Sequence, residues 1–212
     1  MPTPVACLLP ADLKTRFGAL GVAIVEHALS SADLQRMERS FPVAQPLPAE
    51  TVSQGFAGFA PADVSWFGRH EVLGELAAML GGGPMRLVRA IALGNSPEAN
   101  WLAPWHQDQA EDAGQRPIEV LRRMVTLRVH LDDCGEDGGP LEVLPGSHEE
   151  GRLDRAGMAG LALEVAPLLC LAVRGDILAM RPLLVRRSQR ARVPTARRAI
   201  DLEFASAFAL VA

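Results

Sequence analysis

The sequence predicts a mainly β domain of the α+β class, in which a helical section of about 80 residues packs on an antiparallel sandwich or barrel. Three observations support this prediction. The 212 residues are 49% apolar and 22% charged, as in a folded globular domain. From Met85 onward, short apolar or alternating runs are separated by turn clusters. No helical pattern in that part is long enough for the repeated crossovers of a parallel sheet. We therefore expect one domain over residues 1–212, with a helical front over 1–84 and a β core over 85–212.

The front begins with two short elements and a capped helix. Residues 11–20 predict a helix that ends at a glycine, and residues 22–25 predict a strand. Ser30 and Asp33 then have the spacing of a capping box, in which each side chain bonds the backbone of the other residue. This box predicts a helix that runs to about Ser40.

The rest of the chain alternates between loops and short runs. Residues 42–61 are rich in Pro, Ala and Gly, which predicts a surface loop, and residues 71–80 predict a helix stopped by the glycines at 81–83. The runs that predict strands of the β core lie at 85–93, 124–131, 141–144, 161–165, 168–173, 177–179 and 199–204.

Charge and cysteine content exclude several classes of function. A net charge of −4 gives no overall attraction to nucleic acid or to an anionic bilayer, and the apolar stretches are broken well before the roughly 20 residues of a membrane span. The first residues lack the basic start of a secretory signal. Three widely spaced cysteines fit neither a disulfide framework nor a thiolate metal site. We expect a cytoplasmic protein with a small-molecule substrate and no nucleic-acid or membrane partner; the oligomeric state stays open.

The segment Trp105-His106-Gln107-Asp108 is the first candidate site. In an extended strand, residues i and i+2 project from the same face, so His106 and Asp108 can direct an imidazole nitrogen and a carboxylate oxygen at one point. These are two of the three ligands in a site with two histidines and one carboxylate for Fe(II). Trp105 is a candidate pocket residue beside them.

Further motifs follow this segment in a fixed order. They are LRVHLDD at 127–133, GGPLEVLPGSH at 138–148, GDILAMRPLL at 175–184 and RRAIDLEF at 197–204. Together with the WHQD segment, this set resembles the phytanoyl-CoA dioxygenase family, in particular its small bacterial members. The resemblance covers about residues 85–208 in detail, and the combination is far more specific than any one motif.

The resemblance implies a double-stranded β-helix, or cupin-like jelly roll, that holds Fe(II) and 2-oxoglutarate. It implies that His106 and Asp108 bind the iron and that Arg197 binds the distal carboxylate of 2-oxoglutarate, with Arg128 and Asn95 beside the cosubstrate. The fork of planar donors on an arginine suits a carboxylate. The implied reaction is a hydroxylation coupled to oxidation of 2-oxoglutarate to succinate and CO₂. By strand alternation, Arg198 faces away from this site.

Three polar positions depart from the family pattern. Arg186 stands where the family has its distal iron-binding histidine, Asn95 where related sequences commonly have lysine, and Asp201 where they have histidine. A guanidinium has no lone pair to give a metal and adds a positive charge next to a divalent cation. The third ligand is therefore absent. We hypothesise that Arg186 pairs with Asp201 inside the barrel.

Strand alternation places Thr126, Arg128, His130 and Asp132 on one face of their strand. If this face points into the barrel, His130 lines the same cavity as His106, either as a hydrogen-bonding pocket histidine or as a substitute ligand. His148 in the PGSH turn is expected to be structural.

Three functions remain open at this point. The chain is an oxygenase that hydroxylates a small, partly apolar molecule with an incomplete iron site, or it is a non-catalytic member that binds an anionic small molecule without iron. A metal-independent enzyme that uses Arg186 or Asp201 is a third possibility, but no constellation supports a named reaction.

Overall fold

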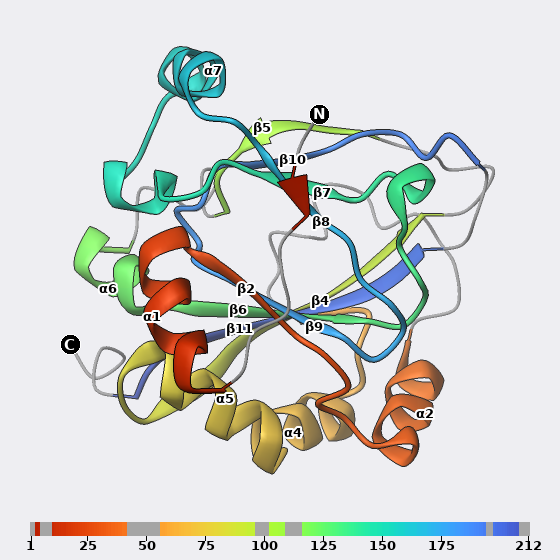
Figure 1. The fold of residues 1–212 in the computed structure, drawn as a ribbon. Coiled ribbons are helices and arrows are strands. Elements are labelled where there is room, and N and C mark those ends of the chain that lie inside the picture. Colours follow the sequence, from red (N-terminus) through yellow and green to blue (C-terminus); the bar gives the residue numbers. More distant parts are fainter. Residues whose placement is uncertain are drawn as a thin grey trace.

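Two β-sheets face each other across the interior of the molecule (Figure 1). The structure is a computed structural model that describes residues 3–4, 10–41, 56–95, 102–108, 116–193 and 197–207. One sheet has five strands in the order β1-β8-β7-β10-β5, and the other has six in the order β2-β9-β6-β11-β4-β3. All neighbours pair antiparallel except β1 with β8 and β3 with β4. This arrangement is the jelly-roll architecture that the family resemblance implied.

The strands are β1 (Thr3–Pro4), β2 (Val22–Val25), β3 (Phe56–Ala57), β4 (Met85–Asn95), β5 (Ala103–His106), β6 (Val125–His130), β7 (Leu141–Val143), β8 (Leu168–Cys170), β9 (Ile177–Met180), β10 (Arg186–Ser188) and β11 (Arg197–Ser206). The helices are α1 (Pro10–Leu20), α2 (Ser31–Ser40), α4 (Pro61–Arg69), α5 (Glu71–Gly81), α6 (Ile118–Arg123) and α7 (Arg155–Glu164), with short 3-10 turns η1 (Glu136–Gly138) and η2 (Ser147–Glu150).

Helices cover the outer face of the six-stranded sheet. The main hydrophobic core joins side chains of α1, α2, α4 and α5 to the outward-facing residues of that sheet, such as Leu127, Val129, Ile200 and Leu202. In Figure 1, α2, α4 and α5 lie along one side of this sheet, and the five-stranded sheet lies on the other. Burial of this apolar layer removes it from water and fixes the sheet on its helices.

Alternation along β6 and β11 turns their other face inward, as predicted for β6. Arg128 pairs in register with Asp201, so the two side chains leave the same face of adjacent strands. A second core cluster joins both sheets through Val143, Leu178 and Met180, which are the strand partners of Arg186, Arg128 and Thr126. The interior between the sheets thus holds apolar and polar side chains next to each other.

Most predicted elements of the front are confirmed. The helix at 31–40 carries the expected capping box, because Ser30 accepts a hydrogen bond from the Asp33 backbone and Asp33 from the Ser30 backbone. Helix α4 was missed because its sequence opens on Ala60-Pro61, which reads as the end of a loop; proline is also favoured in the first turn of a helix. Residues 42–55 of the predicted surface loop lie outside the described residues.

One predicted strand is wrong. Residues 161–165 belong largely to helix α7, whose N-cap Asp154 accepts a hydrogen bond from the Gly157 backbone. A short apolar run cannot by itself distinguish a buried strand from one turn of a helix, and the cap lies outside that run. Strand β2 lies in the predicted helical front yet pairs with β9, so the front contributes to the six-stranded sheet. None of the helices in the described ranges has the length and apolar character to cross a bilayer.

Candidate functional site

Strand pairing brings Arg186 to the side of His106. The two residues are register partners in the antiparallel pair of β10 and β5, and β10 is held on its other edge by β7. Arg186 is 1% exposed and is the largest fully buried side chain in the described part of the chain. The position that the family pattern assigns to an iron ligand therefore holds a guanidinium inside the barrel.

Arg186 forms an ion pair with Asp108. Its Nη2 contacts the Oδ2 atom of Asp108, and its Nη1 donates to the Sδ atom of Met180 at 3.4 Å. Burial lowers the pKa of Arg186 to about 10, against the opposing charges of Asp201 and Glu203. The guanidinium therefore stays protonated at neutral pH, and the carboxylate predicted to bind iron is already paired with a cation.

His106 keeps one lone pair free of the backbone. Its Nδ1 atom lies 2.8 Å from the carbonyl oxygen of Pro104, which can only accept, so Nδ1 carries the proton and Nε2 the lone pair. Burial, and after it the charge of Arg186, lowers the pKa of His106 to about 4. Gln107 holds this segment in place through its amide, which donates to the carbonyls of Gly151 and Leu183. Gln107 was missed as a positioning residue by the sequence analysis.

Asp201 pairs with Arg128, which corrects the hypothesis that it pairs with Arg186. Both carboxylate oxygens of Asp201 accept bonds of 2.7 Å, from Nε and from Nη2 of Arg128. Burial raises the pKa of Asp201, but the charge and hydrogen bonds of Arg128 outweigh it, so the pKa lies below its usual value. The physical reason is register: Arg128 is directly opposite Asp201 on the neighbouring strand, and Arg186 lies on the other sheet.

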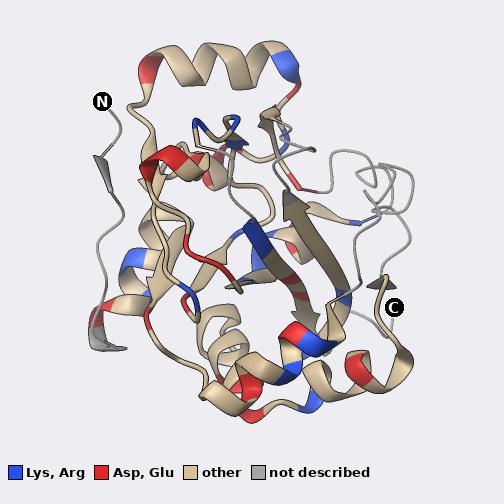
Figure 2. Cartoon of the chain, turned by 90° about the vertical axis from the view of Figure 1, so that its right-hand side faces the viewer, with Lys and Arg blue, Asp and Glu red and all other residues tan. Residues whose placement is uncertain are grey.

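A second interior carboxylate, Glu203, was not predicted. It is buried, it lies 3.4 Å from Nη1 of Arg89 on β4, and burial raises its pKa. Its place two residues beyond Asp201 in the same strand was the signal that could have found it. In Figure 2, acidic and basic residues lie on strands in the middle of the molecule as well as on the outer helices.

Arg197 faces inward and its neighbour Arg198 faces outward, as predicted. Arg198 makes a bidentate pair with Asp132, whereas Nη1 of Arg197 donates to the carbonyl of Gly138 at 3.0 Å. Burial lowers the pKa of Arg197. Within the described ranges, no carboxylate pairs with Arg197. The strand register places Asn95 opposite Arg197, and the Asn95 side chain lies outside the described residues.

His130 lies on the inner face of β6, as its alternation with Arg128 predicted. It is 5% exposed, and neither ring nitrogen has a hydrogen-bond partner in the described structure. Burial, followed by the charge of Arg128, lowers its pKa to about 4. His130 is therefore a buried, neutral imidazole with both nitrogens available.

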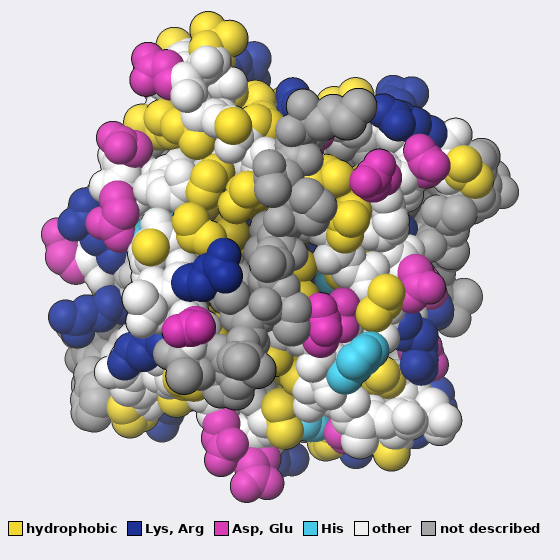
Figure 3. Space-filling view, viewed as in Figure 1, with side chains coloured by type: hydrophobic (Ala, Val, Ile, Leu, Met, Phe, Trp, Pro, Cys, Tyr) yellow, Lys and Arg dark blue, Asp and Glu magenta, His cyan; other side chains and the backbone are white. Residues whose placement is uncertain are grey.

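Trp105 is not a pocket residue. It packs with Leu144, Met158 and Val185 in the apolar layer between α7 and the outer face of the five-stranded sheet, and the Arg187 guanidinium lies 4.6 Å from its ring centre. Adjacent strand residues point to opposite faces, so an inward His106 requires an outward Trp105. In Figure 3, hydrophobic side chains gather around α7, and acidic and basic ones are interspersed over the face shown.

The remaining histidine of the motifs is structural, as predicted. The Nε2 atom of His148 lies 3.1 Å from the carbonyl of Gly18, which ties the PGSH turn to α1. Ser147 in the same turn accepts a hydrogen bond from the Val185 backbone, one residue before Arg186. These bonds position the start of β10.

The donor set does not fit an Fe(II) ion. His106 offers a lone pair, but Asp108 is paired with Arg186, and Arg186 has no lone pair to offer. Across the described ranges, no three His, Cys, Asp or Glu side chains lie close enough together to hold a metal ion. His130 therefore does not act as a substitute third ligand beside His106 and Asp108.

One family model matches most of the chain. The family model described as phytanoyl-CoA dioxygenase (PhyH) matches residues 69–199. A curated relative, L-proline trans-4-hydroxylase from Streptomyces griseoviridis, is 29% identical over 163 residues, which is 70% of this chain and 59% of that protein. The chain thus spans about three-fifths of the length of the relative it matches.

Solved structures share the fold at low sequence identity. AviO1 from Streptomyces viridochromogenes Tue57 has a TM-score of 0.75 at 23% identity, over 97% of this chain and 98% of that one. EctD from S. alaskensis with 2-oxoglutarate and 5-hydroxyectoine has a TM-score of 0.77 at 17% identity, over 99% of this chain and 84% of that one. The jelly-roll fold expected from the resemblance is confirmed.

We expect the protein to lose much of its stability when one partner of the Arg128–Asp201 pair is removed. Asp201→Asn leaves the buried Arg128 guanidinium without its counter-charge, which should lower the free energy of unfolding by about 3–5 kcal/mol in urea denaturation. Asp132→Asn is the matched control, since Asp132 makes a bidentate pair of the same geometry with Arg198 near the surface and should lose about 1 kcal/mol or less. Equal losses in the two variants would contradict this account.

Because of His130, we expect the stability of the folded protein to fall in acid. Its pKa is about 4 in the folded protein against 6.5 for an ordinary histidine, so the unfolded chain takes up the proton first as pH falls. Stability from this residue is complete above about pH 6.5, and about 3 kcal/mol of it is lost by about pH 4.

The measurement is the free energy of unfolding of the wild type and of His130→Gln across that pH range. The groups that face His130 are Arg128, Arg197, Asp201 and Asp132, and they are the same in both proteins. His106 also titrates in both, so the difference between the two curves isolates His130. Parallel curves would show that His130 is protonated alike in the folded and unfolded states.

Proposed function

The chain belongs to the phytanoyl-CoA dioxygenase family, and on that premise we propose that it is a member that binds a small carboxylate between its two sheets without using iron. The observation that carries the proposal is the ion pair between Arg186 and Asp108. Fe(II) and 2-oxoglutarate remain the cofactors of the family pattern, and this chain departs from that pattern at the metal.

The ion pair opposes metal binding in two ways. A divalent ion on His106 and Asp108 would have to displace the guanidinium from the carboxylate, and it would then lie beside a buried positive charge. Arg186 is 1% exposed, so its guanidinium can reach water only if the side chain leaves its fully buried position. The Arg186 guanidinium thus stands where a metal ion would bind, as a positive charge that belongs to the chain itself.

The charge balance around the inner face favours an anion. Arg128 and Arg186 are each neutralised by an aspartate, whereas the half-buried Arg197 pairs with no carboxylate in the described ranges. An unpaired cation with restricted access to water is stabilised by a bound anion. A carboxylate matches the planar donors of a guanidinium. L-proline, for which the curated relative is named, and 2-oxoglutarate, which is bound in the EctD structure, are both carboxylates.

The second candidate is an oxygenase that tolerates two protein ligands. Family membership favours it, and it requires Arg186 to release Asp108 when iron and 2-oxoglutarate bind together. Metal titration distinguishes this candidate from the first, because only the second predicts iron binding to the wild type.

Anaerobic titration of Fe(II) with 2-oxoglutarate should give no metal-to-ligand charge-transfer band in the wild type and a clear band in Arg186→His. The substitution removes the positive charge and adds a lone pair, so it should tighten Fe(II) binding by more than about tenfold, or about 1.4 kcal/mol. Arg187→His is the matched control: it adds a histidine one position along β10, where the side chain points to the outer face toward Trp105. A band in the wild type would support the oxygenase instead.

Carboxylate binding should depend on Arg197 and not on metal. With a chelator present, a dicarboxylate at about 100 times its Kd should stabilise the wild type by about 2.7 kcal/mol, measured as a rise in Tm. Arg197→Gln should weaken binding roughly 10- to 100-fold, because a hydrogen bond to a charged group is lost. Arg198→Gln, its outward-facing neighbour, should bind as the wild type does. Stabilisation that requires added metal would refute the proposal.

A further inference from the structure

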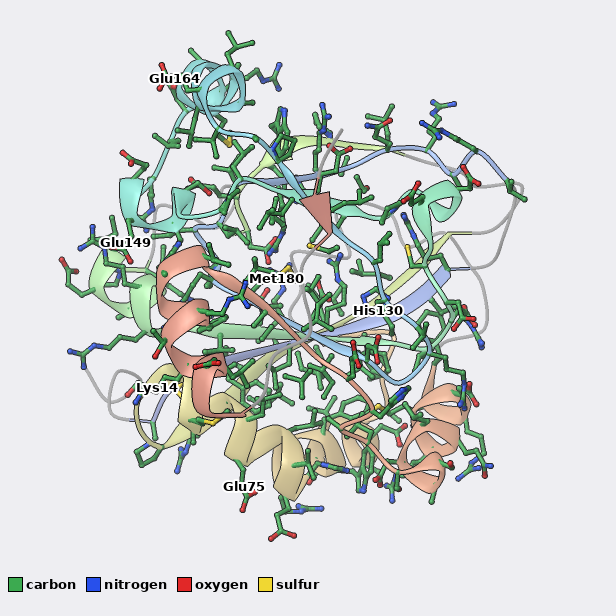
Figure 4. All side chains as sticks on the ribbon, in the orientation of Figure 1. Lys14, Glu75, His130, Glu149, Glu164 and Met180 are labelled. Atoms are coloured by element: carbon green, nitrogen blue, oxygen red, sulfur yellow. The ribbon has the colours of Figure 1, made fainter. Side chains whose placement is uncertain are left out.

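His130 is fixed in position by its backbone and left open at its ring. It is the last residue of β6, its N–H donates to the carbonyl of Asp176, and its own carbonyl accepts from the N–H of Gly175. In Figure 4, the labelled His130 lies between the two sheets, apart from the labelled Met180. Ala199, its register partner on β11, places only a methyl group beside it. The backbone of His130 is therefore fixed by the sheet, and no large side chain stands at the paired position.

Among the residues that the structure describes, neither ring nitrogen of His130 has a hydrogen-bond partner, although the residue is only 5% exposed. Buried polar atoms in folded proteins are nearly always hydrogen-bonded, and each one left without a partner costs about 1–3 kcal/mol. His148 differs from His130, since its Nε2 bonds a backbone carbonyl and only its Nδ1 is left without a partner. Two open nitrogens on one buried ring point to a group that comes from outside the chain.

The surroundings define the chemistry of that group. Arg128 is committed to Asp201, and Arg197 is the nearby cation without a carboxylate, so an anion beside His130 pairs with Arg197. A neutral imidazole has one N–H donor and one acceptor nitrogen. A carboxylate or keto oxygen satisfies only the donor. The acceptor nitrogen needs an N–H or O–H from the ligand.

A neutral donor suits this position better than a charged one. Arg128, Asp201, Arg197 and Asp132 all act electrostatically on His130. Asp201 is paired with Arg128 and Asp132 with Arg198, so an ammonium group here would add a positive charge beside Arg197, which has no carboxylate partner among the described residues. A hydroxyl carries no charge and can both donate and accept. The ligand that completes the hydrogen bonding is therefore a carboxylate with a hydroxyl close to it.

We propose that His130 makes this site selective for hydroxycarboxylates over the corresponding oxo acids and unsubstituted acids. The inference rests on the proposed function, because it assigns the ligand class to the carboxylate site that Arg197 anchors. The hydroxyl donates to the acceptor nitrogen of His130 while the carboxylate pairs with Arg197. An oxo acid of the same length leaves that nitrogen without a donor.

The experiment compares matched ligands that differ only at one carbon. Isothermal titration with chelator present uses three chain lengths: propionate, lactate and pyruvate; succinate, malate and oxaloacetate; and glutarate, 2-hydroxyglutarate and 2-oxoglutarate, with both enantiomers of each hydroxy acid. In at least one length, the hydroxy acid should bind the wild type about 5- to 30-fold tighter than its oxo partner, as expected for one satisfied buried acceptor.

Two variants separate a binding role from a structural one. His130→Leu should lose the preference for the hydroxyl, and His130→Gln, which retains a donor and an acceptor, should keep most of it. The ring ¹⁵N signals of wild-type His130 should shift with the hydroxy acid and much less with the unsubstituted acid. This readout needs no variant, so the proposal can be tested even where His130→Leu does not fold.

The outcomes distinguish this inference from the proposed function. If carboxylates bind through Arg197 without any preference for a hydroxyl, or if the preference survives in His130→Leu, the inference is overturned and the proposed function stands. If no carboxylate binds the wild type, both are overturned. A preference lost in His130→Leu and kept in His130→Gln supports both.

Discussion

Arg186 lies against the carboxylate of Asp108, on the strand next to His106, in the buried space between the two sheets. The properties of the candidate site depend on this contact. It neutralises the carboxylate that would otherwise attract a metal, and it leaves His106 as an uncharged imidazole with a lone pair on Nε2. Breaking the contact would leave the fully buried Arg186 guanidinium and the half-buried Asp108 carboxylate without their partners, which is costly. The same ion pair therefore stabilises this end of the barrel and restricts what it can bind.

The other charged side chains of the interior are also paired. Arg128 and Asp201 bond each other through two short hydrogen bonds, and Arg89 on β4 approaches Glu203, which lies two residues beyond Asp201 on β11. Each pair is set by the antiparallel register of β11 with its neighbours, so the sheet itself aligns the charges. In the described part of the interior, Arg197 has no carboxylate partner and the His130 ring has no hydrogen-bond partner. The groups that the interior does not satisfy are the groups that a ligand can satisfy, which connects the stability of the barrel to its proposed selectivity.

The two faces of β6 and β11 have different roles in the fold. Their outward side chains pack on the helices as the main apolar core, and their inward side chains are almost all polar or charged. A polar inner face is tolerated because the apolar layer outside the six-stranded sheet and the second cluster between the sheets supply hydrophobic burial. A rigid sheet with a polar inner face holds its side chains in defined directions, which is the property a selective binding site requires.

Local patterns were sufficient for many elements. The capping box placed the helix that begins at Ser31, and alternation along residues 126–132 placed Arg128 and His130 on one face. Patterns failed where the deciding residue lay outside the run: Asp154 caps α7 before the apolar stretch that was interpreted as a strand. Trp105 was predicted to line the pocket because it is next to His106 in the sequence, but strand alternation directs the two side chains to opposite faces.

The sequence by itself determined the family, the jelly-roll fold, the absence of a histidine at position 186 and the inward face of β6. These follow from motif order, residue identity and the two-residue period of a strand, all of which are local properties. Only the tertiary structure decided which carboxylate each buried arginine meets. Asp108 and Asp201 are both far from Arg186 along the chain, and the pairing of β10 with β5 brings Arg186 to Asp108 while β6 brings Arg128 to Asp201. Charge pairing depends on distance in space, and strand register between distant segments is what sets that distance.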